Sequence, residues 1–435
     1  MIEVLTLGGF KEVGRNCTAV RVDNEVVILD LGLKMEEYVA YTQDEDVVEI
    51  SGKKLIEHNA APDVFVMGDW KDKVVGIILG HAHLDHIGAV PFLANKFKAD
   101  IHGSPFTIEV LRAMLDDKKT YMRNQLKTEK LDTPFKLSQN ITVELISMTH
   151  STPQTALIAI YTKYGTVLYA NDFKLDLFPV LGKTPSFNKL RSLKPRIMVI
   201  DSLYADAAMK TPSERVAKEM LRDVFISTNA KNNAVVVTTF SSHIERLKSI
   251  IDFGNQLNRK IVFLGRSLSK YVEAAEKVGL VKFSKEVEMV KYGEKIQKFI
   301  KTVKRPQDYL FVVTGHQGEP KATLSKMLKF FNFKPDDVVI FSCKIIPTPI
   351  SIKNRESLEE ELRKRKVRIF KDIHVSGHGS REDLRDLLQL VKPEKIIPAH
   401  AELPKLLALK QLALEIGYKE SDVYILGNNE RVKIP

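Results

Sequence analysis

Four side chains of types that commonly bind metal ions lie within six residues of this 435-residue sequence. They follow the apolar run 74–80, which predicts a buried strand. A strand that ends in a short loop can aim its side chains at one point, because its buried body holds them rigidly. Imidazoles suit zinc, and an added carboxylate allows more than one ion. We therefore predict a metal centre that contains His81, His83, Asp85 and His86.

Three further residues with metal-binding chemistry stand at the ends of apolar runs: Asp30, His150 and Asp172. Taken singly, a polar residue at the end of a strand is more typical of a hydrogen bond to the local backbone. Their recurrence after successive predicted strands indicates instead that they gather at one edge of a sheet.

Together these residues resemble the first four motifs of the metallo-β-lactamase fold, in which two zinc ions share a carboxylate and a hydroxide. The motifs do not choose a substrate, since lactamases, glyoxalases, lactonases, arylsulfatases and nucleases resemble one another here. The resemblance implies one zinc on His81, His83 and His150, a second on Asp85 and His86, Asp172 as the bridge, and Asp30 as the residue that orients ligands.

The composition favours a globular protein without a membrane segment. No apolar run is long enough to span a bilayer. The opening residues 1–9 predict a strand and lack the pattern of a signal peptide. Cys17 and Cys343 form neither a disulfide framework nor a metal-type spacing. We expect a cytoplasmic protein.

Positive charge is concentrated in the middle third of the chain. Residues 203–345 hold 25 basic and 15 acidic residues, a net charge of +10, whereas the whole chain carries +11. This asymmetry indicates a module that faces a polyanion. The alternative is a lysine-rich surface that merely interacts with solvent.

The same region alternates predicted strands and helices, which predicts an inserted parallel α/β layer. Short strands return after residue 345. The predicted strands are 234–240, 260–265, 309–314, 337–341, 367–370, 395–398 and 423–426, and the predicted helices are 106–116, 212–227, 243–257, 268–278, 381–391 and 404–417.

An α/β insert within a metallo-β-lactamase fold resembles the β-CASP nucleases. Three more positions match that family: Asp201 ends a strand before the insert, while His378 and His400 follow it. The resemblance makes His400 a further ligand of the second zinc, and Asp201 a supporting residue. We predict an α/β protein with a metallo-β-lactamase αββα sandwich and an inserted β-CASP domain. Its expected parts are 1–202, 203–345 and 346–435.

Within β-CASP proteins, the chain resembles the archaeal branch of the ribonuclease J family. Segments 5–16, 314–320 and 374–380 carry the likeness, with His316 in place of a serine and of open role. The last segment resembles the family's 5′-phosphate pocket, and its glycines, hydroxyls and imidazoles are chemically suited to a phosphate. The expected substrate-binding residues are His374, Val375, Ser376, Gly377 and His378.

The resemblance implies a zinc-dependent 5′→3′ exoribonuclease that acts on single-stranded RNA with a 5′-monophosphate. Asp85 would accept the proton of the nucleophile, and His378 would stabilise or protonate the departing oxygen. Manganese in place of zinc, a homodimer and membership of an RNA-degradation complex stay open. The alternatives are an endoribonuclease or RNA 3′-end processing enzyme, an inactive RNA-binding subunit, and a small-molecule hydrolase. The complete ligand set argues against the inactive subunit.

Overall fold

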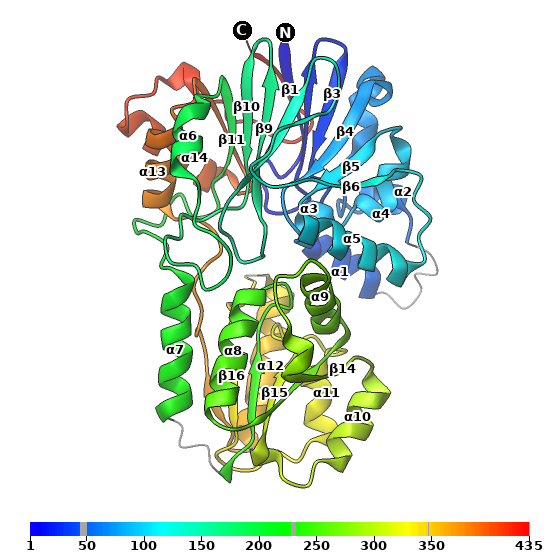
Figure 1. Cartoon of the computed structure of the whole chain (residues 1–435), viewed down its shortest axis with the longest axis vertical. Helices are drawn as coiled ribbons and strands as arrows, with labels where there is room; N and C mark the ends of the chain where they lie inside the picture. The colour runs from blue at the N-terminus through cyan, green and yellow to red at the C-terminus, as the bar shows by residue number, and fades with distance from the viewer. Residues whose placement is uncertain (44–49, 228–231, 347, 435) are drawn as a thin grey trace. The chain divides into compact units, whose positions relative to one another are not determined.

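The structure is a computed structural model that describes residues 1–43, 50–227, 232–346 and 348–434. Its chain forms two compact units (Figure 1). The first unit contains residues 1–177, 183–211 and 377–435, and the second contains 178–182 and 212–376. The first unit is therefore assembled from chain segments on both sides of an insert.

Two sheets form the body of the first unit. The seven-stranded sheet has the order β19-β1-β2-β3-β4-β5-β6, and the six-stranded sheet has the order β18-β11-β10-β9-β8-β7. The strands of the first are β1 (Ile2–Gly8), β2 (Cys17–Val22), β3 (Glu25–Leu29), β4 (Val74–Leu79), β5 (Asp100–Gly103), β6 (Leu126–Thr128) and β19 (Arg431–Ile434). Those of the second are β7 (Phe135–Lys136), β8 (Thr142–Ser147), β9 (Ala156–Thr162), β10 (Gly165–Ala170), β11 (Ile197–Asp201) and β18 (Lys395–Ala399).

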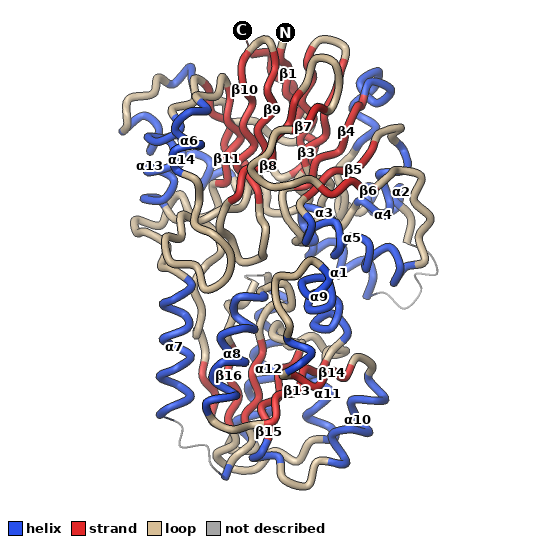
Figure 2. Tube along the Cα trace, in the orientation of Figure 1, coloured by secondary structure: helices blue, strands red, loops and turns tan. Residues whose placement is uncertain are grey.

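Apolar side chains of the two sheets meet in one core, which includes Val20, Val27 and Ile78 from one sheet and Ile158 and Val199 from the other. A second core joins the outer face of the six-stranded sheet to three helices (Figure 2). These are α6 (Phe187–Leu193), α13 (Arg381–Val391) and α14 (Leu403–Glu415). Beside the other sheet lie α1 (Met35–Gln43), α2 (Gly52–Glu57), α3 (Leu84–Ile87), α4 (Val90–Leu93) and α5 (Pro105–Lys118). This arrangement confirms the predicted αββα sandwich.

The strands that lead into the predicted site run parallel. In one sheet β3 pairs in parallel with β4, and in the other β10 and β18 both pair in parallel with β11. Parallel neighbours place their carboxyl ends at the same edge, which is where residues of distant sequence position can meet. The polar residues at the carboxyl ends of these strands therefore come together within each sheet.

The second unit contains an entirely parallel sheet of order β14-β13-β15-β12-β16-β17, as the alternation of strands and helices predicted. Its strands are β12 (Val235–Thr238), β13 (Lys260–Leu264), β14 (Val287–Val290), β15 (Tyr309–Val313), β16 (Val338–Phe341) and β17 (Arg368–Phe370). Its helices are α7 (Glu214–Ser227), α8 (Ile244–Gln256), α9 (Arg266–Lys277), α10 (Gly293–Thr302), α11 (Thr323–Phe330) and α12 (Pro349–Lys364).

The end of the insert lies later than the expected residue 345. The short strand β17 pairs with β16 of the second unit, and the compact division falls between residues 376 and 377. The expected strand 423–426 is also absent from the described structure, because only Val423 bridges to Ile396 and the chain then turns. The last strand is instead β19, which pairs with β1.

None of the helices in the described part of the chain is both long enough and apolar enough to cross a bilayer.

A buried ion pair anchors α7 to α8 in the second unit. Arg246 donates to Glu214 through Nε at 2.6 Å and Nη2 at 2.9 Å, and both side chains are buried. Burial favours the neutral acid, but Arg246 and His243 hold the pKa of Glu214 well below its usual range. Arg246 also donates to the carbonyl oxygens of Ser342 and Ile373.

Removing one partner of this pair leaves the other charge buried without a counter-charge. We expect Glu214→Gln to lower the free energy of unfolding by about 3 kcal/mol or more, measured by urea unfolding. The matched control is Glu219→Gln on the same helix, which breaks an exposed pair with Arg222 and is expected to cost less than about 1 kcal/mol. Equal effects of the two changes would contradict this reading.

Candidate metal centre

The chain bends sharply just after three strands, and each bend carries a predicted site residue. Asp30, Asp172 and His400 have φ angles of 59°, 54° and 57°, which lie in the left-handed region. Few side chains adopt this conformation, and Asp and His are among those that favour it. Each bend follows the end of β3, β10 or β18 and turns its side chain inward, so that all three are buried.

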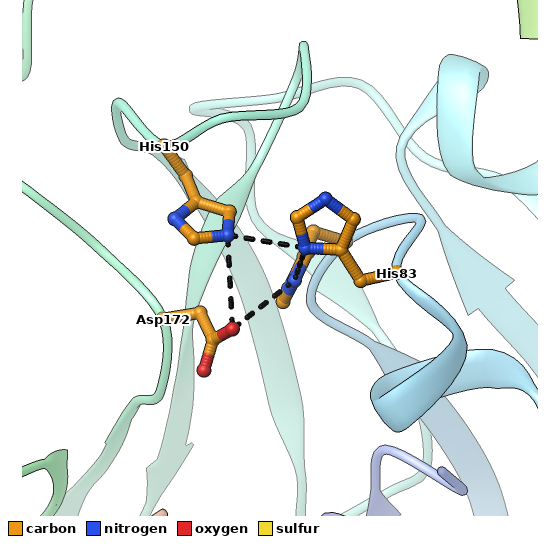
Figure 3. Close-up of side chains that lie close together, drawn as sticks. His83, His150 and Asp172 are labelled. Atoms are coloured by element: carbon orange, nitrogen blue, oxygen red, sulfur yellow. Dashed lines mark hydrogen bonds and ion pairs between the residues drawn. The ribbon is translucent and has the colours of Figure 1, made fainter. Parts of the chain in front are cut away.

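One group of donor atoms consists of three imidazoles and a carboxylate. His83 Nδ1 lies 3.1 Å from His81 Nε2 and 3.2 Å from His150 Nε2. Asp172 Oδ2 lies 3.5 Å from His81 Nε2 and 3.7 Å from His150 Nε2. Figure 3 shows His83, His150 and Asp172 pointing toward one another. The sequence-predicted ligands of the first ion therefore converge.

A second group adjoins the first through Asp172. His86 Nε2 lies 3.5 Å from Asp85 Oδ2, and His400 Nε2 lies 3.9 Å from the same oxygen. Asp172 Oδ2 is 3.2 Å from His86 Nε2, and its Oδ1 is 3.7 Å from His400 Nε2. Asp172 is thus the one carboxylate in contact with both groups, in the place that the sequence predicted for a bridge.

Hydrogen bonds on the far side of three of the rings fix which nitrogen faces the centre. His86 donates from Nδ1 to Asp30 Oδ2 at 2.6 Å, and His150 donates from Nδ1 to the Gly377 carbonyl at 2.7 Å. His400 likewise donates from Nδ1 to the Asn16 side-chain oxygen at 2.9 Å. Each Nε2 therefore faces the centre, as a metal ligand requires, and that of His86 also lies 3.0 Å from Asn16 Nδ2.

These donors fit a divalent cation. Within each of the two groups, the ligand atoms all lie within 4.8 Å of one another. Lone pairs of neutral imidazoles that face carboxylate oxygens repel unless a cation lies between them. Asp172 Oδ1 is also buried without a hydrogen-bond partner among the described residues, which is costly for a carboxylate that binds nothing.

Burial keeps two ligands of the first group neutral. Burial and the neighbouring His81 lower the pKa of His83 to about 3. Burial, together with His81 and His83, also holds the pKa of His150 well below its usual range. Neutral imidazoles are the form that binds metals, so this group is ready for a cation across the physiological pH range.

His378 adjoins the centre but has a different environment. It donates from Nδ1 to Asp201 Oδ2 at 2.8 Å, while its Nε2 is 3.9 Å from Asp172 Oδ2. Burial lowers its pKa, but Asp172 and Asp201 outweigh that effect and raise it to about 9. His378, Asp172 and His400 also form a third set with metal-binding geometry, which the sequence did not predict.

Two asparagines of the site escaped prediction. Asn16 donates to the carbonyl of Asp85 at 3.1 Å and accepts from His400, and Asn171 donates to the Asn16 side-chain oxygen at 2.9 Å. Asn16 therefore links a ligand from each end of the chain. Asn16 lies in segment 5–16, which resembles the family. A hydrogen bond between residues as distant in sequence as Asn16 and His400 leaves no local pattern from which it could be predicted.

The expected phosphate segment is divided between the units. His374, Val375 and Ser376 belong to the second unit, whereas Gly377 and His378 belong to the first. Gly377 is required by packing, because a Cβ there would lie 2.7 Å from Ser151 Oγ and 2.9 Å from His150 Cε1.

The start of α13 already interacts with a carboxylate of its own helix. Asp383 Oδ2 accepts from the backbone amides of Thr211 at 2.7 Å and Ser380 at 3.1 Å, so a carboxylate already interacts there. Ser380 and Asp383 form a capping box.

His316 serves the packing of the second unit. Its ring meets Phe240 edge to face at 4.3 Å, and its carbonyl accepts from Arg355 at 2.7 Å. Burial and Arg355 lower its pKa to about 3, so the ring is neutral.

Three family models match this chain. The metallo-β-lactamase superfamily covers residues 11–209, the ribonuclease J β-CASP domain covers 232–356, and the Zn-dependent metallo-hydrolase RNA specificity domain covers 364–426. With the fold and the ligand cluster, they define a metal-dependent hydrolase of the β-CASP class.

Curated relatives give a finer assignment. A ribonuclease J of Methanocaldococcus jannaschii is 38% identical over 99% of this chain and 98% of its own length, and one of Pyrococcus abyssi is 37% identical over 100% and 98%. One of Helicobacter pylori is 28% identical over 100% of this chain and 61% of its own length. The chain belongs to the ribonuclease J family. A crystal structure of an Enterococcus faecalis protein of unknown function has the same fold, with a TM-score of 0.69 and 15% identity over 99% of both chains.

The bond from His86 to Asp30 gives a test of the centre. A carboxylate behind a ligand imidazole makes the ring more basic and fixes its orientation, and its loss typically weakens metal binding 10–100-fold. We expect about this loss for Asp30→Asn, measured by competition with a chromophoric chelator. Asp23→Asn, which removes a surface carboxylate, is the control. An unchanged affinity in Asp30→Asn would contradict the assigned role.

Proposed function

We propose that this protein is a zinc-dependent exoribonuclease that degrades single-stranded RNA from a 5′-monophosphate end. The observation that carries the proposal is the pair of ligand groups sharing Asp172, with His378 held beside them by Asp201. Family membership supports RNA as the substrate. Cytoplasmic location, a homodimer, an RNA-degradation complex and a role of the insert's positive charge in RNA binding stay predictions.

The ligand set favours zinc over manganese. Five of the seven predicted ligands are imidazoles, namely His81, His83, His86, His150 and His400, and the carboxylates are Asp85 and Asp172. Manganese prefers sites richer in carboxylate and water. When bound, such ions activate water and stabilise negative charge on phosphoryl oxygens.

The protein's own side chains would supply proton transfer and orientation. Asp85 is partly exposed, so it can accept the proton of an attacking water. His378 would donate from Nε2 to a phosphoryl oxygen or to the departing 3′-oxygen, since Nδ1 is engaged by Asp201. Asp201 is thus a positioning residue that keeps the imidazole protonated and correctly oriented.

The preference for a 5′-monophosphate rests on the segment 374–378. Ser376 carries a hydroxyl, Gly377 is a buried glycine that lets the backbone pass close to His150, and His374 and His378 carry ring nitrogens. A site that holds the terminal phosphate would set the spacing between that end and the bond to be cut. Cleavage would then release mononucleotides in succession from the 5′ end.

Removal of the metal should abolish cleavage. We expect His81→Ala and Asp172→Asn to lose activity on RNA together with bound zinc, because each change removes a ligand that both activates water and stabilises charge. Elemental analysis should find up to two zinc ions per chain in the unaltered protein. Cleavage that survives both changes and chelation would show that the two-metal assignment is wrong.

The direction of cleavage can be measured with one unstructured RNA labelled at either end. We expect early release of labelled mononucleotide from the 5′-labelled copy, and slower cleavage when the RNA begins with a triphosphate. Ser376→Ala should reduce the preference for the monophosphate, whereas Ser284→Ala, an exposed serine elsewhere, should not. Discrete internal fragments from both copies would favour the endonuclease instead.

A further inference from the structure

A basic groove lies on the outer side of the six-stranded sheet, within the first unit. It encloses about 890 Å³ and runs along α6, the C-terminal half of α13 and the segment after β10. None of the metal-centre residues lines it. The mechanism described above leaves this groove without a role.

Cations surround the groove. Arg191, Lys194 and Lys392 line it together with a fourth cation, Lys210, which pairs with Asp386. Lys194 and Lys392 are exposed, and neither has an ion-pair partner among the described residues. The lining therefore carries an excess of positive charge that the protein itself leaves unneutralised.

The fold places the two unpaired lysines side by side. Each is the left-handed residue that ends its helix, with φ of 38° at Lys194 and 52° at Lys392. Each also stands three positions before the first residues of β11 and β18 that pair in parallel, Ile197 and Lys395. The amide of Glu394 donates to the Pro195 carbonyl at 2.9 Å. This hydrogen bond joins the two segments of the chain just after the lysines.

A lysine at the C-terminus of a helix interacts favourably with the helix dipole, which would explain either lysine alone. It does not explain why they border a groove with an apolar lining. Leu175 and Val391 are buried there, and Phe187 and Leu390 are half-buried. Cations around an apolar surface with an aromatic ring are what single-stranded nucleic acid requires, because the phosphates and bases need different partners.

We propose that this groove binds a distal stretch of the RNA substrate, away from the nucleotide being cleaved. Lys194 and Lys392 would contact phosphates, and Phe187 would meet a base. The matched RNA specificity domain, residues 364–426, contributes α13 to this groove. The inference rests on RNA as the proposed substrate and not on the direction of cleavage.

The test measures RNA affinity in the metal-loaded protein with phosphorothioate RNA that resists cleavage, so that the centre is intact and cleavage does not interfere. The double variant Lys194→Glu with Lys392→Glu should bind a long unstructured RNA roughly tenfold more weakly at low salt, with the slope of log affinity against log salt reduced by about 2. Its affinity for a ribonucleotide trimer should be unchanged, because a trimer held at the metal centre does not extend to the groove. The double variant Lys98→Glu with Lys433→Glu carries the same charge change on exposed lysines of the first unit outside the groove and should match the unaltered protein.

Each other outcome overturns the proposal. An unchanged affinity for long RNA excludes the groove as an RNA site. If the groove variant loses as much affinity for the trimer as for the long RNA, the effect is a general electrostatic one. The same conclusion follows if the control variant loses as much affinity for the long RNA as the groove variant does. Tight binding of a free nucleoside monophosphate that the groove variant loses would identify an effector site. If the glutamate variant does not fold, as judged by thermal unfolding, Lys194→Gln with Lys392→Gln is measured against the same criteria.

A failure of this test is distinguishable from a failure of the proposed function. Metal-dependent cleavage of the trimer depends on the centre alone, so it should persist in the groove variant. If RNA is not the substrate, neither the long RNA nor the trimer is cleaved by the unaltered protein.

Discussion

The buried carboxylate of Asp172 is the constraint on which the first unit depends. Imidazoles from four separate segments and a second carboxylate surround it, and four of these imidazoles, those of His81, His86, His150 and His400, are buried. Without a cation this is a costly arrangement of lone pairs and negative charge. Three of the rings are held from their far side by a hydrogen bond: Asp30 holds His86, Asn16 holds His400, and the Gly377 carbonyl holds His150.

Those supports explain why the sandwich is built from both ends of the chain. β18 brings His400 beside β11, and Asn16, which lies just before β2, accepts a hydrogen bond from it. The insert between these segments forms its own core, in which buried Arg246 ties together α7, α8 and the backbone near Ile373. Each unit is thus stabilised by its own buried charges, and the ligands of the centre come from one unit alone.

The structure shows where positive charges lie relative to one another, which the composition cannot show. The sequence drew attention to the insert, where lysines are most numerous, but abundance on exposed helices is compatible with solvation alone. The groove of the first unit contains fewer cations, yet two of them are unpaired and stand at equivalent places before the neighbouring strands β11 and β18. Register in a parallel sheet, and not residue count, makes the lysines adjacent.

The sequence by itself predicted the metal ligands and determined the class of fold. Metal ligands in proteins are drawn from a few residue types, and here His81, His150 and Asp172, like the supporting Asp30, each follow an apolar strand closely enough to leave a local pattern in the sequence. Four strands of the insert's parallel sheet, β12, β13, β15 and β16, were also predicted, because each contains a run of buried apolar residues. Only the tertiary structure decided that β17 belongs to the insert, that β19 closes the first sheet, and that Asn16 and Asn171 support the ligands. Strand pairing and hydrogen bonds between distant residues arise from proximity after folding, and an amide or a short strand carries no sequence signal of its partner.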